Sequence, residues 1–265
     1  MPGSSIQSIE RAAAVLRLLA STERPLGLAE LSVALDLPRP TVHGIVRTLR
    51  DVEFVVQEPG DSRYRLAKAL HGLGRGGVDP HDLRAAAMNW ADSLAGSTGL
   101  AVLLGVVDGH RVQVVHHVFR PDGSAQRLRT GEDQPLHAGA LGKCLLAFAP
   151  VSTPPTRALE LLRFTGRTCT DVESLDAHLA TARRRGWADE LAELEPGVGG
   201  AAAPIRASGG TVVGALGVTG PVDELFGVGG KLRRPHAEQL VLASREVSGA
   251  LLEMQATPHP IGWRP

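Results

Sequence analysis

The sequence predicts an α+β protein with an N-terminal winged helix-turn-helix domain and a larger C-terminal domain of antiparallel hairpins and helices. Three observations predict this fold. Two short amphipathic helices and a hairpin follow one another within residues 28–66, and a glycine-rich passage at 72–80 comes next. After Gly99, short apolar runs separated by turn residues replace the helical pattern. Hairpins grouped with helices in this way are typical of α+β domains.

The first two helices are predicted by apolar residues at helical spacing, namely Ile9, Ala12, Ala13, Leu16 and Leu19, and then Leu28, Leu31, Ala34 and Leu35. Gly27 is an acceptable N-cap of the second helix, and Glu30 stands three residues later, where it can reach back to the free amides. The second helix is expected to end at Asp36–Pro38, because a residue that precedes proline is pushed out of the helical region.

The third helix follows at once and has two contrasting faces. Pro40 suits its first position, where a missing N–H costs nothing. Its buried stripe is expected to be Val42, Ile45, Val46 and Leu49. The opposite face carries groups that can hydrogen-bond base edges or phosphates, together with a glycine that permits close approach: Arg39, Thr41, His43, Gly44, Arg47 and Thr48.

A basic hairpin is predicted directly after this helix. The strands Phe54–Val56 and Tyr64–Leu66 flank residues 59–62, whose composition favours a turn. Helix, turn, helix and wing in this order place the second helix of the pair in the DNA major groove. The expected DNA contacts are the polar face of the third helix with Pro40, and Arg63 and Tyr64 on the wing. The alternative for Arg47 is a structural pairing with Asp51 at i+4.

Charge supports a local rather than an extended nucleic-acid surface. The chain of 265 residues has 28 basic and 28 acidic side chains. Residues 37–75 contain seven basic side chains against four acidic ones, which makes this segment positive. A basic reader on a neutral protein is what sequence-specific binding to double-stranded operator DNA needs.

The remaining elements follow from turn signals and periodicity. Residues 1–76 form the predicted DNA-binding domain, and 77–98 a linker helix whose apolar face of Leu83, Ala87, Trp90 and Leu94 packs on its own domain or on a second subunit. Hairpins are expected around Asp108–Gly109 and around Ser208–Gly210. Helices are expected near 139–148, 155–164, 174–185 and 235–254, and residues 257–265 form a tail.

No catalytic, metal or cofactor site is predicted. Cys144 and Cys169 lie too far apart for a zinc motif. His137 and Cys144 could form a nucleophilic pair, which leaves an enzyme with an accessory winged helix as the alternative. A buried, structural Cys144 is the simpler reading, because it falls among leucines. The sequence contains no signal peptide and no apolar run of about 20 residues, so we expect a cytoplasmic protein with no membrane partner.

Several ordered motifs resemble the IclR family of bacterial transcription regulators. They are Ser5–Ala12, the helix-turn-helix segment, His137–Lys143, Arg185–Trp187 followed by Glu193 and Gly197, Ala202–Ile205, and Val218–Pro221. The resemblance implies a winged helix joined through a linker helix to a GAF-like antiparallel sheet flanked by helices. It also implies a homodimer or a dimer of dimers, often a repressor, whose operator affinity is controlled by a small-molecule effector.

Carried over by motif position, the resemblance implies an effector pocket lined by Ala140, Leu141, Glu190, Val198, Gly200, Gly217 and Thr219. Members that bind carboxylates offer hydroxyls, a thiol and a shorter acid where this chain has Gly217, Gly200 and Glu190. A buried acid without a cationic partner disfavours an anionic ligand. We therefore expect an enlarged cavity and a larger, less acidic effector, such as an aromatic compound, a lactone or a polyol.

Overall fold

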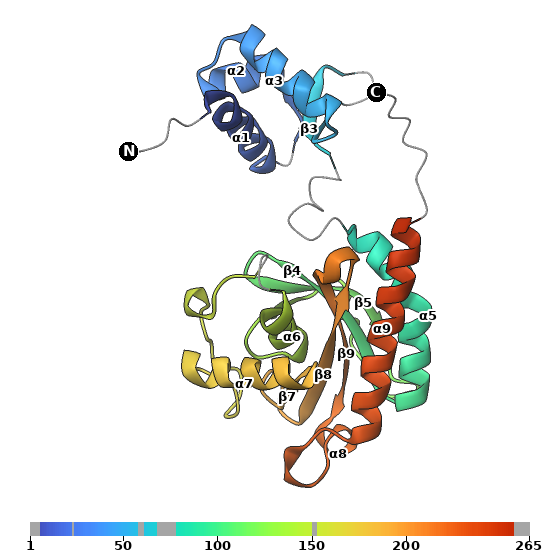
Figure 1. Cartoon of the computed structure of the whole chain (residues 1–265). Coiled ribbons are helices and arrows are strands. Elements are labelled where there is room, and N and C mark those ends of the chain that lie inside the picture. The colour runs from blue at the N-terminus through green and yellow to red at the C-terminus, as the bar shows by residue number, and fades with distance from the viewer. Residues whose placement is uncertain (1–5, 23, 58–60, 68–77, 150–152, 257–265) are drawn as a thin grey trace. The chain divides into compact units, whose positions relative to one another are not determined.

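The computed structural model describes residues 6–22, 24–57, 61–67, 78–149 and 153–256. The chain divides into two compact units, residues 1–79 and 80–265. Each unit is described by itself below (Figure 1). The predicted glycine-rich passage from Gly72 to Gly77 and the predicted tail lie outside the described residues. The predicted boundaries at 76, 98 and 256 stay predictions.

The N-terminal unit consists of a helical trio and a small antiparallel sheet. The helices are α1 (Gln7–Ala20), α2 (Leu28–Leu35) and α3 (Arg39–Asp51), and the strands are β1 (Leu26–Gly27), β2 (Val55–Gln57) and β3 (Arg63–Leu66). The sheet has the order β1-β3-β2, with Leu26 opposite Tyr64 and Gln57 also opposite Tyr64. The predicted wing is therefore present, and β1, which sequence reasoning missed, is its third strand.

Local sequence determines where the helices begin and end. The Glu30 carboxylate accepts a hydrogen bond from Gly27 N at 2.9 Å, which confirms the predicted reach back to a free amide. Helix α2 ends where Asp36 adopts the left-handed conformation, with φ 51°. Val42, Val46 and Leu49 of α3 are buried, as predicted.

The buried face of α1 is rotated from the prediction. Val15 and Leu19 are its buried residues, whereas Ile9, assigned to the apolar stripe, is 63% exposed. Leu16 packs partly against the core. The physical reason is that the stripe from Ala12 through Val15 and Leu19 contacts α2, α3 and β3, and the helix extends beyond this contact at its N-terminal end.

The C-terminal unit is built on one six-stranded antiparallel sheet of order β6-β5-β4-β9-β8-β7. Its strands are β4 (Ala101–Asp108), β5 (Arg111–Val118), β6 (Asp133–Pro135), β7 (Ala188–Leu191), β8 (Val198–Arg206) and β9 (Val212–Pro221). Both predicted hairpins are present, since β4 pairs with β5 across Gly109 and β8 pairs with β9. The pairing of β4 with β9 joins the two hairpins side by side.

Two helix layers cover the sheet. Helices α5 (Pro80–Thr98) and α9 (Arg234–Ala256) pack together on one face, while α6 (Ala140–Phe148) and α7 (Val172–Arg185) lie on the other (Figure 1). A short helix, α8 (Val222–Leu225), follows β9. Asp171 caps α7 by accepting a hydrogen bond from Ser174 N, and Gly186 ends it with φ 88°.

The predicted linker helix corresponds to α5 and packs within its own unit. Leu83, Ala87 and Leu94 are buried, so most of the predicted apolar face contacts α9 and the sheet. Trp90 is 38% exposed, which departs from its assignment to the same face.

The prediction of a helix over residues 155–164 is wrong. Only a single 3₁₀ turn forms there, at Thr156–Ala158. Backbone groups of the segment form hydrogen bonds with side chains outside it instead. The His137 ring is hydrogen-bonded to Leu162 O, and Phe164 N donates to Thr168 Oγ1. The segment is thus an irregular connection, and its apolar residues Leu159 and Leu161 pack against the core from outside.

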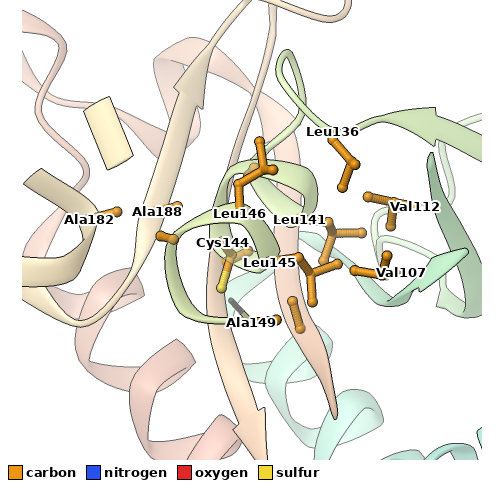
Figure 2. Close-up of a cluster of buried hydrophobic side chains, with 14 of the residues drawn as sticks. Val107, Val112, Leu136, Leu141, Cys144, Leu145, Leu146, Ala149, Ala182 and Ala188 are labelled. Carbon is orange, nitrogen blue, oxygen red and sulfur yellow. The ribbon is translucent and has the colours of Figure 1, made fainter. Parts of the chain in front are cut away.

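The core between α6, α7 and the sheet is dominated by small and aliphatic side chains. Leu141 and Leu145 of α6 face Val107 and Val112 of the first hairpin, and Cys144 of α6 belongs to the same cluster (Figure 2). Cys144 and Val112 are completely buried. Since α6 packs this closely on strands β4, β8 and β9, its position fixes the residues at its N-terminal end, where the cavity described below opens.

Gly142→Ala is expected to lower the free energy of unfolding by about 1–3 kcal/mol or more, because overpacking a close contact forces the backbone to move. A Cβ at Gly142 would lie 2.4 Å from Leu136 O. The matched control is Gly96→Ala in α5, where a Cβ meets nothing within 4 Å and helix propensity favours alanine. Urea unfolding of both variants checks this; equal stability of the two would contradict the contact.

Candidate DNA-reading surface and effector pocket

The polar face of α3 is presented to solvent. Arg39, His43 and Arg47 are exposed, and their side chains form no hydrogen bond or ion pair within the described part of the chain. Gly44 is also exposed, and a Cβ there meets nothing within 4 Å. Three donor side chains one turn apart, on a helix whose other face is buried, form a surface that can enter a groove of DNA.

The structural alternative for Arg47 is not observed. Asp51 pairs instead with Arg50, at 3.6 Å between Oδ1 and Nη2, and both groups are largely exposed. Thr48 is less available, because its hydroxyl donates to Gly44 O at 3.0 Å within the helix. Arg47 is therefore exposed and unpaired within the described part of the chain, and its contact with a base edge stays a prediction.

The two wing residues singled out from the sequence behave differently from the expectation. Tyr64 is only 6% exposed and belongs to the core of the N-terminal unit, because its strand position points inward. Its assignment as a DNA contact is corrected on that ground. Arg63 donates to Pro25 O and lies 3.6 Å from Glu30 and 3.5 Å from Asp61. It thus ties the wing to α2, and a phosphate contact would have to replace these partners.

The seven residues assigned to the effector pocket lie around one cavity in the C-terminal unit. Sequence reasoning missed Leu103, Arg129, Gln134, Gly139, Leu194, Glu195, Ala201 and Val218, which also line it. The cavity leaves about 30 Å³ for the centres of water-sized molecules, more than the roughly 10–15 Å³ that one bound water needs. A compact ligand with few heavy atoms fits this space. The ligand-binding role of the seven residues stays a prediction.

The two glycines do not enlarge the cavity, which corrects the expectation that they leave extra space in it. A Cβ at Gly217 would lie 3.0 Å from Leu141 Cδ2, and one at Gly200 would lie 3.2 Å from Ala140 Cβ. The space that side chains would occupy is thus taken by the first turn of α6. The glycines serve to bring α6 close to β8 and β9.

Three polar side chains converge on the cavity. Glu190 of β7 and Gln134 of β6 are each 6% exposed, and Thr219 of β9 is half-buried. The Gln134 amide makes no hydrogen bond among the described residues, so both its donor and its acceptor are available. The Thr219 hydroxyl donates to Gly199 O at 3.0 Å and can still accept.

Glu190 is held by the backbone of the next loop. Its Oε2 accepts a hydrogen bond from Glu193 N at 2.8 Å. Burial raises the pKa of Glu190 to about 8, and the neighbouring Glu193 carboxylate adds to this. The backbone hydrogen bonds from Glu193 and Leu194 and the charge of Lys143 oppose the rise in pKa. The raised pKa favours the protonated form of this carboxyl, which closes one side of the cavity, at neutral pH.

Behind Glu190 lies a buried ion pair. Lys143 Nζ of α6 is 2.5 Å from Glu193 Oε1, and the two side chains are 2% and 7% exposed. Lys143 also lies 3.2 Å from His178 Nδ1 of α7, and Cys169 N approaches the other Glu193 oxygen at 3.4 Å. Burial and the Lys143 charge lower the pKa of His178. This network joins α6, α7 and the loop that follows β7.

On the opposite side, an ion pair stands between the cavity and the surface. Arg129 Nη2 is 2.7 Å from Glu195 Oε1, and their side chains are 18% and 39% exposed. Arg129 also lines two neighbouring hollows, one of which includes His110 and Phe164 and the other His117 and Gly220. The pair therefore separates the small cavity from larger, more open ones.

The geometry at His137 and Cys144 does not favour nucleophilic chemistry. Burial raises the pKa of the Cys144 thiol strongly, which keeps it protonated. The His137 ring is 3% exposed and hydrogen-bonded to Leu162 O rather than to sulfur. Among the residues that the structure describes, no group of three or more His, Cys, Asp or Glu side chains is placed to hold a metal ion.

No helix in the described ranges has both the length and the apolar character needed to cross a membrane.

A winged helix with an exposed polar reading face, together with a sheet domain that contains a partly open cavity, is typical of ligand-responsive transcription regulators. Family models agree with this class. The IclR helix-turn-helix domain matches residues 8–59, and the C-terminal domain of bacterial IclR transcriptional regulators matches residues 76–248. The chain belongs to the IclR family of transcription regulators.

Similar proteins support the same assignment. The chain is 45% identical to the glycerol operon regulatory protein of Streptomyces griseus and 44% identical to that of Streptomyces coelicolor, and each match covers 93% of this chain and 95% of the relative. The crystal structure of an IclR regulator from Alicyclobacillus acidocaldarius is 26% identical, with a TM-score of 0.55, and the match covers 94% of this chain and all of that one.

Proposed function

We propose that this regulator represses an operon by binding its operator through α3, and that a small molecule bound in the cavity of the C-terminal unit releases it. The observation that carries the proposal is the convergence of Glu190, Gln134 and Thr219 on one partly open cavity in a chain that also presents an exposed reading face. Effector and operator are then linked by a coupling free energy of about 1–3 kcal/mol. The protein would act on DNA in the cytoplasm.

We further propose a small polyol of the glycerol type as the effector. The cavity volume favours a compact ligand, and an acid, an amide and a hydroxyl together match a molecule that carries several hydroxyl groups. The names of the two Streptomyces relatives, which are regulators of glycerol operons, support this choice. Of the three effector classes expected from the sequence, the polyol has the most hydroxyl groups to pair with these three polar side chains.

Fluorescence anisotropy with the DNA upstream of the chain's own gene tests the proposal. We expect salt-sensitive binding that glycerol weakens roughly 5- to 150-fold, as the coupling range implies. Glyoxylate serves as the anionic comparison and is expected to have a smaller effect. Operator binding that neither compound changes would remove glycerol as the effector, and salt-sensitive DNA binding by itself would still support the regulator.

Gln134→Leu is expected to abolish the response to glycerol while leaving operator affinity unchanged without it. The amide has no hydrogen-bond partner among the described residues, so its replacement by a side chain of similar size leaves no buried group newly unsatisfied. Gln113→Leu in β5, half-buried and absent from the lining of the cavity, is the control. A normal response in Gln134→Leu would show that the ligand binds elsewhere.

We also propose that the protein acts as a homodimer or a dimer of dimers. Exposed apolar side chains on two helices support self-association: Ile9 on α1 is 63% exposed, and Met88 and Trp90 on α5 are 44% and 38% exposed. Two readers would favour pseudo-palindromic half-sites about 10 base pairs, or a multiple of that, apart. Light scattering during gel filtration measures the state directly, and a monomer at micromolar concentration bound to DNA would oppose this proposal.

The enzyme alternative gains no support from the site. The Cys144 thiol is buried and protonated, and similar proteins are named as regulators. We therefore propose that the pocket binds its ligand without transforming it.

A further inference from the structure

Glu190 stands at the boundary between the cavity and the buried charge network, and its two oxygens have different surroundings. Oε2 is occupied by the hydrogen bond from Glu193 N at 2.8 Å. Oε1 faces Gly200, at 3.5 Å from where a Cβ would lie, beside Ala140. One oxygen is thus an engaged acceptor, and the other points toward the space that a ligand would occupy.

No cation neutralises this carboxyl. Lys143 is the nearest buried positive charge, and it is bound to Glu193 and His178. Arg129, across the cavity, is bound to Glu195. Neither pairs with Glu190 within the described part of the chain. An ionised Glu190 would stand next to the Glu193 carboxylate, 6% exposed and without an ion-pair partner among the described residues, so desolvation and repulsion both disfavour its charge.

The other charged groups around this wall do not change that balance. On the side away from the cavity, Glu190 lines a hollow with Arg167, Arg185 and Asp189. Arg185 pairs with Asp189, and its guanidinium lies over the Trp187 ring. Arg167 is exposed to solvent, which screens its charge. Protonation of Glu190, rather than an ion pair, therefore removes its charge.

We propose that Glu190 is a specificity-determining residue that carries a proton at neutral pH and donates its hydrogen bond through Oε1 to an acceptor oxygen of the effector. This inference rests on the effector pocket proposed above. Backbone N–H of Glu193 already occupies Oε2, whereas Oε1 lies beside Gly200 in the wall of the cavity, where a protonated carboxyl can donate to a ligand. A hydroxyl, ether or carbonyl oxygen of the ligand accepts it.

The charge state of Glu190 affects how the pocket discriminates between a neutral and an anionic ligand. A neutral Glu190 does not repel an anion, so discrimination against glyoxylate comes from charge only when Glu190 ionises. Because burial raises the pKa of Glu190 to about 8, that repulsion appears above this pH. The preference for glycerol over glyoxylate is therefore expected to widen as the pH rises from 7 to 9.

Titration calorimetry of the full chain with glycerol, from pH 6.5 to pH 9, tests the role of the proton. When the protonated form binds the ligand, affinity is constant below the pKa of the free protein and falls above it, by at most tenfold for each pH unit. We expect this decline in the natural chain. Glu190→Gln, whose amide can also donate, is expected to bind within about threefold at pH 7 and to show no decline.

Two further measurements keep the test decisive. Glu195→Gln removes a carboxyl on the other side of the cavity and is expected to retain the decline above pH 8. Infrared spectra of the ligand-free protein report the protonated carboxyl directly, and its band at pH 7 is expected to be missing in Glu190→Gln. Affinity that rises with pH, or a spectrum at pH 7 without that band in the natural chain, would overturn the proposal.

A failure of glycerol to bind at any pH would count against the polyol effector rather than against the proton. In that case the infrared band at pH 7 alone decides whether Glu190 is protonated: its presence supports the inference, and its absence overturns it.

Discussion

Lys143→Met is expected to lower the free energy of unfolding of the C-terminal unit by about 3–5 kcal/mol, the usual cost of removing one partner of a buried ion pair. Methionine preserves most of the volume of the stem but leaves Glu193, 7% exposed, without the ammonium that lies 2.5 Å from it. Trp90 and Trp187 both lie in this unit, so their fluorescence during urea unfolding follows it.

Two comparisons separate the ion pair from simple loss of a side chain. The double variant Lys143→Met with Glu193→Gln is expected to recover much of the loss, because no charge then remains buried. Arg234→Met breaks an exposed pair with Glu238 and is expected to cost below about 0.5 kcal/mol. A loss smaller than 1 kcal/mol in Lys143→Met would show that water or another group compensates Glu193.

The elements that the sequence predicted well are those in which a local pattern and tertiary packing agree. The Asp108–Gly109 signal and the flanking apolar runs predicted β4 and β5, and the structure places the two-residue turn at Gly109 and His110, with Asp108 opposite Arg111. Helix α7 was found because its body is amphipathic, and its limits agree with an Asp171 cap and Gly186. In both places the signal lies within a few consecutive residues.

The elements that were missed or wrong depend on contacts from far along the chain. Strand β6 has three residues and exists because Gln134 lies opposite Val112 in β5. Strand β7 pairs with β8 alone, with Glu190 opposite Gly200. The segment from 155 to 164 has apolar residues at helix-like spacing, but Leu162 O is committed to the His137 ring. Such partners cannot be read from local periodicity.

The cavity residues also divide into those that a sequence motif predicts and those that depend on contacts from far along the chain. Ala140, Glu190 and Gly217 could be placed by motif resemblance, and the structure brings them together. Gln134 and Arg129 could not, because Gln134 lies in a strand of three residues and Arg129 in a connection, and neither segment carries a periodic signal. The ion pair of Lys143 and Glu193 joins residues 50 positions apart and depends on how α6 docks against the loop after β7. Its absence from the sequence prediction explains why Glu190 was treated there as a charged group.

Arg47→Ala is expected to weaken operator binding by about 1–3 kcal/mol, which is the discrimination that a bidentate contact to one guanine provides. The prediction follows from the geometry of α3, where Val46 and Leu49 are buried while Arg47 is exposed and unpaired within the described residues. Anisotropy titrations with the operator and with single-base variants of it measure the effect.

The pattern of loss across operator variants distinguishes a base contact from a phosphate contact. If Arg47 reads a base, Arg47→Ala relaxes discrimination at that one position and leaves the other positions unchanged. A uniform loss with a shallower salt dependence would assign Arg47 to a phosphate instead. Arg17→Ala on α1 removes the same charge from an exposed site of the same unit, so it isolates the electrostatic part. Because charge acts at a distance and base recognition does not, only Arg47→Ala should change the ranking of the operator variants.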